Sequence, residues 1–177
     1  MLYVGRLAPP KDHATLFRAV AKVRANNPNV QLWMVGNGPL GPNLRRLSEE
    51  LVLDECVTFF GEQADVSPFL AAADLFVMSS ISEGLPVSLL EAMSAGLPAV
   101  VTDVGGMGEI ARLSKAALLV PPSNPQALAD VLSEAAKRSD ELTKMGNIAR
   151  RCYEENFTPE RMLNDYMRLY TRSLSHN

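Results

Sequence analysis

The sequence is poor in the residues that build metal sites and disulfide frameworks. Its 177 residues include only two cysteines, Cys56 and Cys152, and two histidines, His13 and His176. The cysteine spacing matches no metal motif, so we expect free, mostly buried thiols in a reducing compartment, with a disulfide as the alternative. Both histidines are expected at the surface, and the sequence shows no cluster of ligands that would hold a metal ion.

Long apolar runs and an excess of basic residues are missing as well. No apolar run approaches the ~20 residues of a membrane-spanning helix. The chain opens with a strand-like segment, residues 2–4, and not with a signal peptide. The net charge of −3 leaves no basic excess to neutralise a nucleic-acid backbone. We therefore expect a cytoplasmic chain whose partners do not include nucleic acid.

The sequence does contain enough apolar residues for a full core. Hydrophobic residues make up 47% of the chain and charged residues 21%, which is typical of a globular domain. We find no repeat, low-complexity tract or internal linker. Residues 1–177 are therefore expected to form a single domain.

Continuous apolar runs alternate with helical patterns along the whole chain. Strands are predicted at residues 2–4, 31–35, 56–60, 75–78, 98–102 and 116–120. Helices are predicted at residues 13–26, 43–53, 66–73, 86–95, 125–137, 141–156 and 159–173, with a short one near Glu109. Uninterrupted apolar strands suit a parallel sheet that is covered on both faces. The pattern predicts an α/β fold, a doubly wound, Rossmann-like parallel sheet of about six strands.

The stretch from Ser79 to Pro98 is the segment around which the chain is organised. It follows an apolar strand and begins with a loop of serine, glutamate and glycine. A helix is then expected to begin at Pro86, since proline suits the first helical position, and to stop at Gly96. A second apolar strand follows, so the stretch reads as strand, turn, helix and strand.

The first turn of this helix is a predicted anion site. Its N–H groups lack partners and lie at the positive end of the helix dipole. The proline supplies no N–H, which leaves the amides of Val87, Ser88 and Leu89 as donors. Two carboxylates, Glu83 and Glu91, bracket the turn. A carboxylate is a poor phosphate ligand but a good acceptor for hydroxyl groups, so the pattern indicates a ligand with both phosphate and hydroxyl-rich rings.

Turns with glycine or small polar residues follow the other predicted strands. In doubly wound sheets, ligands bind at the carboxyl ends of the strands, near the point where the strand order reverses. The turns at these ends are Gly5-Arg6, Gly36–Gly38, Gly61-Glu62, Ser79–Glu83 and Asp103–Gly106. We expect one site along this edge.

A dinucleotide-binding fingerprint is also present. Residues 36–41 read G-x-G-x-x-G between a strand and a helix, and Glu62 lies about twenty residues further on. However, Pro39 and Pro42 remove N–H groups that a pyrophosphate would need. The motif also falls on the second βα unit, away from the usual switch point. Nicotinamide or flavin binding is therefore the weaker alternative.

Five groups of residues occur in an order that resembles a known family. They are Gly5-Arg6-Leu7 with Lys11, Gly36-Asn37-Gly38-Pro39, Glu83-Gly84-Leu85-Pro86, Glu91-Ala92-Met93 and Gly105-Gly106 with Glu109. Together they resemble the C-terminal, donor-binding half of a family 4, retaining glycosyltransferase of the GT-B fold. The resemblance covers nearly the whole chain. Its most specific part is the pair of glutamates separated by seven residues around Gly-Leu-Pro.

The resemblance implies a role for each matching residue. Arg6 and Lys11 would clamp the diphosphate of a nucleotide sugar, and Glu83 would face the sugar hydroxyls; these three form the catalytic set. Glu91 would accept the ribose hydroxyls, and the loop of residues 61–66 would border the base. The other donor-binding residues implied are Gly5, Gly36, Gly38, Gly61, Glu62, Val66, Gly84, Leu85, Pro86, Val87 and Ser88.

Each charged residue also has a purely structural interpretation. Arg6 could form a surface ion pair, and Glu83 could simply complement the helix N-terminus. Glu91 and Glu109 could be ordinary helix acids. Lys11 is harder to explain in this way, because its positive charge before a helix start is repelled by the helix dipole. This repulsion destabilises the fold by about 0.3–1 kcal/mol. A bound phosphate would offset that cost.

The resemblance further implies a reaction and its partners. The enzyme would be a retaining hexosyltransferase that moves a sugar from a UDP-, GDP- or ADP-linked donor to an acceptor hydroxyl, with no metal or cofactor. Its N-terminal acceptor domain would be absent, since the chain begins where the second half would begin. Weak or no activity is then expected of this chain, with self-association through the uncovered helix of residues 159–173.

Two further expectations accompany this interpretation. The whole enzyme would work in the cytoplasm or at the inner face of the membrane. The alternative is a stand-alone, non-catalytic module that binds a nucleotide sugar. A GT-B epimerase or phosphorylase is a weaker alternative, because a phosphorylase needs a pyridoxal lysine and none is convincing here.

Overall fold

A parallel sheet of six strands forms the centre of the computed structural model, which describes residues 1–174. The strands are β1 (Leu2–Val4), β2 (Leu32–Val35), β3 (Val57–Gly61), β4 (Phe76–Met78), β5 (Ala99–Thr102) and β6 (Ala117–Val120). They lie in the order β3-β2-β1-β4-β5-β6, and every neighbouring pair is parallel. The doubly wound, Rossmann-like prediction is confirmed, and the strand order reverses between β1 and β4.

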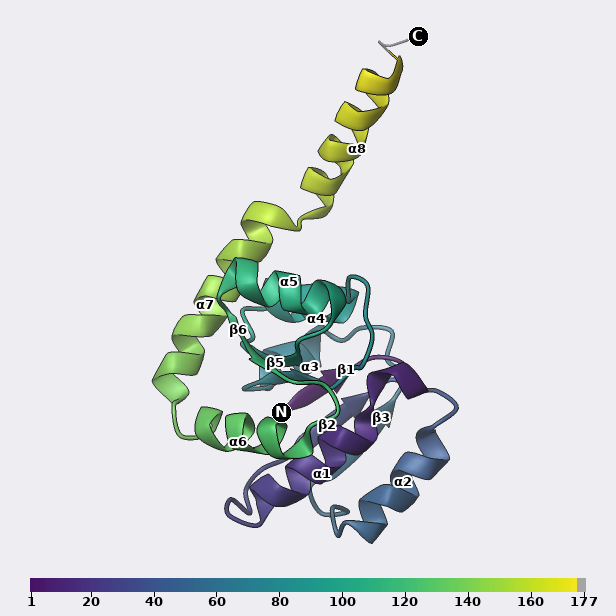
Figure 1. The fold of residues 1–177 in the computed structure, drawn as a ribbon, viewed down its shortest axis with the longest axis vertical. Coiled ribbons are helices and arrows are strands. Elements are labelled where there is room, and N and C mark those ends of the chain that lie inside the picture. The colour runs from purple at the N-terminus through teal and green to yellow at the C-terminus, as the bar shows by residue number, and fades with distance from the viewer. Residues whose placement is uncertain (175–177) are drawn as a thin grey trace.

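Helices cover both faces of the sheet, as predicted. They are α1 (His13–Arg24), α2 (Gly41–Glu50), α3 (Ser67–Ala72), α4 (Val87–Ser94), α5 (Gly105–Ser114), α6 (Pro125–Ala135), α7 (Ser139–Asn156) and α8 (Pro159–Leu174). A short 3₁₀ helix, η1 (Pro9–Lys11), precedes α1. Helices α1, α2 and α6 lie on one face of the sheet, and α4, α5 and α7 lie on the other (Figure 1).

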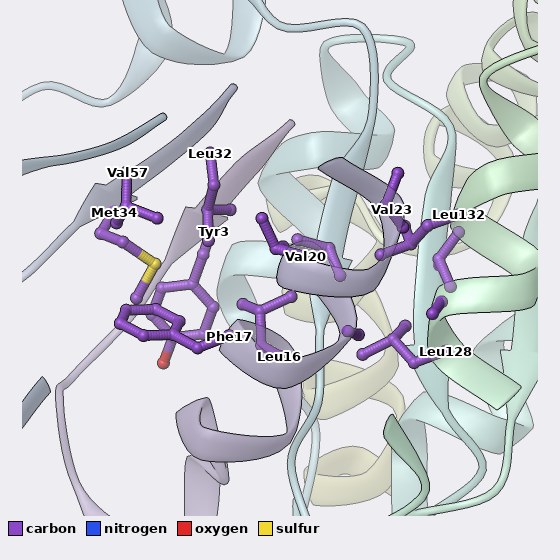
Figure 2. Close-up of a cluster of buried hydrophobic side chains, with 14 of the residues drawn as sticks. Tyr3, Leu16, Phe17, Val20, Val23, Leu32, Met34, Val57, Leu128 and Leu132 are labelled. Carbon is purple, nitrogen blue, oxygen red and sulfur yellow. The ribbon is translucent and has the colours of Figure 1, made fainter. Parts of the chain in front are cut away.

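Successive residues of a strand contribute to opposite faces. Tyr3 packs in one buried cluster with Leu16 of α1 and Leu128 of α6 (Figure 2). Its neighbour Leu2 belongs to a second cluster, which includes Leu89 of α4. Because side chains alternate along a strand, an apolar run of this kind can fill both layers at once. Complete burial of one such side chain stabilises the fold by about 1.5–3 kcal/mol.

Helix α8 extends away from the rest of the chain (Figure 1). Six of its large apolar side chains are each more than half exposed: Met162, Leu163, Tyr166, Met167, Leu169 and Tyr170. Exposed apolar side chains gathered on one helix in this way are typical of a contact surface. Among the residues described, no helix is long and apolar enough to cross a membrane.

The prediction for the cysteines is confirmed, whereas the prediction for His13 is wrong. Cys56 and Cys152 are both buried free thiols, which confirms the prediction. The surface prediction for His13 is wrong, because this first residue of α1 is only 1% exposed. Its ring packs edge-on against Tyr3, with 4.8 Å between the ring centroids. His176 lies outside the described residues.

Candidate functional site

The loops that follow β1 and β4 are tied to each other at the point where the strand order reverses. Ser79 Oγ lies 2.9 and 3.0 Å from the carbonyl oxygens of Lys11 and Asp12, to which it donates. The Ile81 N–H donates to the carbonyl oxygen of Pro10 at 2.8 Å. These bonds hold the loop after β4 against the turn that precedes α1.

This arrangement brings Lys11 and Glu83, two members of the predicted catalytic set, into direct contact. Lys11 Nζ donates to Glu83 Oε1. Ser80 Oγ donates to the same oxygen at 2.7 Å. The two charged side chains are 20% and 10% exposed. Because solvent screens such a pair only partly, each charge is held in place by the other.

The start of α4 differs from the prediction in two details. The helix begins at Val87, and Pro86 occupies the cap position before it with extended backbone angles. Leu89 is not a free donor, because its N–H bonds to the carbonyl oxygen of Pro86 at 3.1 Å. Within the described chain, the N–H groups of Val87 and Ser88 have no acceptor. Two donors therefore remain at the positive end of this helix, where anions bind.

Two glycines at the start of α5 allow it to press against the loop that carries Glu83. The Gly106 N–H donates to the carbonyl oxygen of Gly84 at 2.9 Å. A Cβ atom on Gly106 would lie 2.0 Å from that oxygen, and one on Gly105 would lie 2.0 Å from the carbonyl oxygen of Glu83. Gly105 also has a φ of +45°, which disfavours any other residue. The glycine pair therefore sets the position of this loop.

A cavity of about 370 Å³ opens at the carboxyl ends of β1, β2 and β3. Five predicted site residues line it: Gly5, Arg6, Gly36, Glu62 and Val66. Val4, Val35, Asn37 and Gln63 complete the lining. Lys11, Glu83 and the α4 residues do not line it. The predicted site thus has two parts, this cavity and the Lys11–Glu83 region, and the loop after β1 contributes to both.

Gly36 and Gly38 pack beneath the turn that follows β1. A Cβ atom on Gly36 would lie 2.0 Å from the carbonyl oxygen of Gly5, and one on Gly38 would lie 2.4 Å from that of Leu7. The N–H groups of Gly38 and Leu40 are already bonded, to Asn37 Oδ1 at 2.8 Å and to the Leu7 carbonyl oxygen at 3.0 Å. Since β2 also lies away from the reversal point, the turn is poorly suited to a dinucleotide pyrophosphate.

The predicted site residues differ in how far they are exposed. Glu91 is partly buried on α4, and this burial raises the pKa of its carboxyl group above the usual range. Arg6 and Glu62 are exposed. Leu85 and Val87 are also exposed, although they are apolar. Gly61 and Gly84 have open space where a Cβ atom would lie.

Three hydroxyl residues hold the site together, and sequence reasoning gave none of them a role, although it placed Ser79 and Ser80 in a turn at this edge. Ser79, Ser80 and Thr102 are fully buried at the carboxyl ends of β4 and β5. Thr102 Oγ1 donates to the carbonyl oxygen of Ser80 at 2.5 Å. The available signal was small polar residues directly after apolar strands.

In the part of the chain that is described, no group of three potential ligands could hold a metal ion.

The fold and these loops together define a Rossmann-like domain of the GT-B type. The chain belongs to the family Glycosyl transferases group 1, whose pattern matches residues 1–152. It is 31% identical over 169 residues to the lipopolysaccharide core biosynthesis glycosyltransferase LpsE of Rhizobium meliloti, covering 96% of this chain and 48% of that protein. It is 30% identical over 180 residues to a D-inositol 3-phosphate glycosyltransferase of Rhodococcus erythropolis, covering 97% and 40%. The chain thus spans about half, or less, of these relatives.

Solved structures give the same result for the fold. Sucrose-phosphate synthase from Thermosynechococcus elongatus superposes with a TM-score of 0.90 at 27% identity, covering 99% of this chain and 45% of that one. HepE of Anabaena, solved in complex with UDP, superposes with a TM-score of 0.86 at 24% identity, covering 99% and 48%. The second likeness concerns the fold alone. Both match about half of a larger protein.

Proposed function

We propose that this chain is the donor-binding half of a retaining, metal-independent hexosyltransferase that moves a sugar from a nucleoside diphosphate sugar to an acceptor hydroxyl. The observation that carries the proposal is the Lys11–Glu83 contact at the reversal point of the strand order, on loops that also bear Arg6 and lead into α4. In the proposal, Arg6 and Lys11 are the cations, Glu83 is the acceptor for hydroxyl groups, and Val87 and Ser88 supply the free amides; the contact supports this assignment. Membership of a glycosyltransferase family supports the same reaction class.

In this proposal, the positive groups stabilise the leaving nucleoside diphosphate. Negative charge grows on its phosphate oxygens as the bond to the sugar breaks. Arg6, Lys11 and the free amides of Val87 and Ser88 would stabilise that charge, and such preorganised donors are usually the largest catalytic contribution. The contact with Glu83 holds Lys11 in the site before the donor binds.

The sugar, ribose and base would occupy different parts of the edge. Glu83 would accept bonds from the sugar hydroxyls and Glu91 from the ribose hydroxyls. The cavity of about 370 Å³, with Glu62 and Val66 in its wall, would receive the base. UDP is the first nucleotide to test, because the HepE structure of the same fold was solved with UDP.

The acceptor would be bound by a second half that this sequence does not include. The relatives support this part of the proposal, since the chain spans only about half of their length. The exposed apolar face of α8 would contact that half, and a second copy of the chain would cover it in isolation. Binding without efficient transfer is then expected. The cytoplasmic location remains a prediction.

Hydrogen exchange with and without saturating UDP tests the location of the site. We expect slower exchange in residues 83–91, where the amides of Val87 and Ser88 are free, and in residues 5–12. Helix α6, on the opposite face from α4, serves as the internal reference and should be unchanged. Protection confined to other segments, or no protection under conditions where UDP binds, would contradict the proposed site.

A further inference from the structure

Tyr3 is a polar residue in the middle of an otherwise apolar cluster. Its side chain is fully buried, in the layer that also contains Leu16 and Phe17 (Figure 2). The hydroxyl donates to the carbonyl oxygen of Arg6 at 3.2 Å. The hydroxyl also lies directly under Gly5, the residue before Arg6, because a Cβ atom on Gly5 would lie 2.9 Å from Tyr3 Oη. The ring therefore supports the turn that carries Arg6.

His13 contacts this tyrosine from the start of α1. The two rings meet edge to face, with 4.8 Å between centroids and an angle of 71°. Neither ring nitrogen of His13 has a hydrogen-bond partner in the described part of the chain. The histidine thus acts through the packing of its ring. His13 follows Lys11 and Asp12 directly in the sequence. The contact between Tyr3 and His13 therefore connects the turn that carries Arg6 with the turn that carries Lys11.

The surroundings keep both side chains neutral. Burial, together with the charge of Glu83, raises the pKa of Tyr3 above its usual range. Burial lowers the pKa of His13 to about 4, and the charge of Lys11 acts in the same direction. At neutral pH the pair therefore supplies ring packing and one hydroxyl donor, with no charge of its own.

The packing of the ring alone does not account for the tyrosine hydroxyl. Phenylalanine would fill the same layer, and burying a hydroxyl is costly unless it is bonded. The one bond that this hydroxyl donates is to Arg6, a residue of the proposed site. We propose that Tyr3 and His13 are positioning residues, which set the two cationic turns, and so Arg6 and Lys11, relative to each other. This inference rests on the proposed function, because its effect is measured through diphosphate binding.

A double-mutant cycle between Tyr3→Phe and Arg6→Ala tests the inference. Affinities for UDP and for uridine are measured by calorimetry, together with the melting temperature of each variant. Tyr3→Phe should weaken UDP binding about fivefold, equivalent to about 1 kcal/mol, and leave uridine binding unchanged. In the Arg6→Ala background the same substitution should cause a clearly smaller loss, because the guanidinium on the turn that the hydroxyl holds has gone and only Lys11 remains to be positioned.

His13 provides the second arm of the test. His13→Ala removes the ring and should also weaken UDP binding selectively, whereas His13→Phe keeps an aromatic ring and should restore it. Losses that multiply between Tyr3→Phe and Arg6→Ala would overturn the inference. It would also be overturned if UDP and uridine affinity fell together with the melting temperature. If the wild-type chain binds no nucleoside diphosphate, the proposed function fails and this inference fails with it.

Discussion

Lys11 and Glu83 lie 72 residues apart in the sequence, and their side chains form an ion pair across the reversal point of the sheet. The contact depends on the topology, since β1 and β4 are neighbours and the loops that follow them meet. Ser80 supplies a second donor to the same carboxylate. The ion pair therefore joins two loops of the fold and also forms part of the proposed donor site.

Breaking this pair should reduce stability in a non-additive way. Lys11→Met and Glu83→Gln should each lower the free energy of unfolding by about 1–3 kcal/mol, because each leaves a shielded group without its partner. The double variant should lose less than the sum, as urea denaturation can measure. Arg150→Met, which breaks an exposed pair with Glu154, should change stability by under about 0.5 kcal/mol. Strictly additive losses at Lys11 and Glu83 would contradict the described contact.

Gly106→Ala should displace the loop that carries Glu83. The new Cβ atom would lie 2.0 Å from the carbonyl oxygen of Gly84, so the loop or the start of α5 must move. We expect a loss of about 1–3 kcal/mol in unfolding free energy, despite the better helix propensity of alanine. Gly84→Ala is the matched control for stability, because its Cβ atom would meet no atom within 4 Å. Equal effects of the two substitutions would argue against the close approach.

The burial of His13 should make stability depend on pH. The pKa of His13 is about 4 in the folded chain against 6.5 for the free side chain, so the unfolded state binds the proton first as the pH falls. Protonation of His13 therefore has no effect on the free energy of unfolding well above pH 6.5, and it lowers that free energy progressively as the pH falls from 6.5 to about 4. The total loss is about 3 kcal/mol.

His13→Phe isolates this contribution, because phenylalanine does not titrate. Other groups also titrate in this range, among them Glu91, whose raised pKa acts in the opposite direction. The quantity to compare is therefore the difference between wild type and variant in unfolding free energy at pH 4.5 and at pH 7. A difference that stays constant with pH would show that His13 is as accessible to protons as a surface residue.

Helix α8 should cause the isolated chain to self-associate. Its exposed apolar residues include Met162 and Tyr166, one turn apart on the same side of the helix. Sedimentation velocity should show association that grows with concentration, and replacing both residues with glutamate should abolish it. Asn164→Glu, at another exposed position of α8, should leave it unchanged. A wild-type chain that stays monomeric at all concentrations would refute this prediction.

The sequence was sufficient to predict the elements of the fold but not the contacts between distant loops. The strands were predictable because residues such as Phe76 and Val100 lie in short, uninterrupted apolar runs. The contact between Lys11 and Glu83 was not, because only the order of the strands brings their loops together. The burial of His13 depends in the same way on Tyr3, whose ring reaches it from a neighbouring element.

Some details of the predicted site are wrong because of backbone contacts that the sequence does not reveal. The place of Leu89 in the first turn predicts a free donor, but the carbonyl oxygen of the capping Pro86 already accepts its N–H. Gly36 and Gly38 fit a ligand-binding pattern in the sequence, and the structure shows that they allow two turns to pack closely. Spacing alone cannot distinguish a glycine that approaches a ligand from one that approaches another loop.

Calorimetric titration of the purified chain with UDP, and then with GDP and ADP, tests the central claim most directly. We expect one of the three to bind, and we expect Glu91→Ala to lose at least tenfold in affinity, about 1.4 kcal/mol. Glu49→Ala, which removes an exposed carboxylate near the end of α2, should bind as the wild type does. If the folded chain binds none of the three at millimolar concentration, or if Glu91→Ala binds as tightly as the wild type, the proposed donor site is wrong.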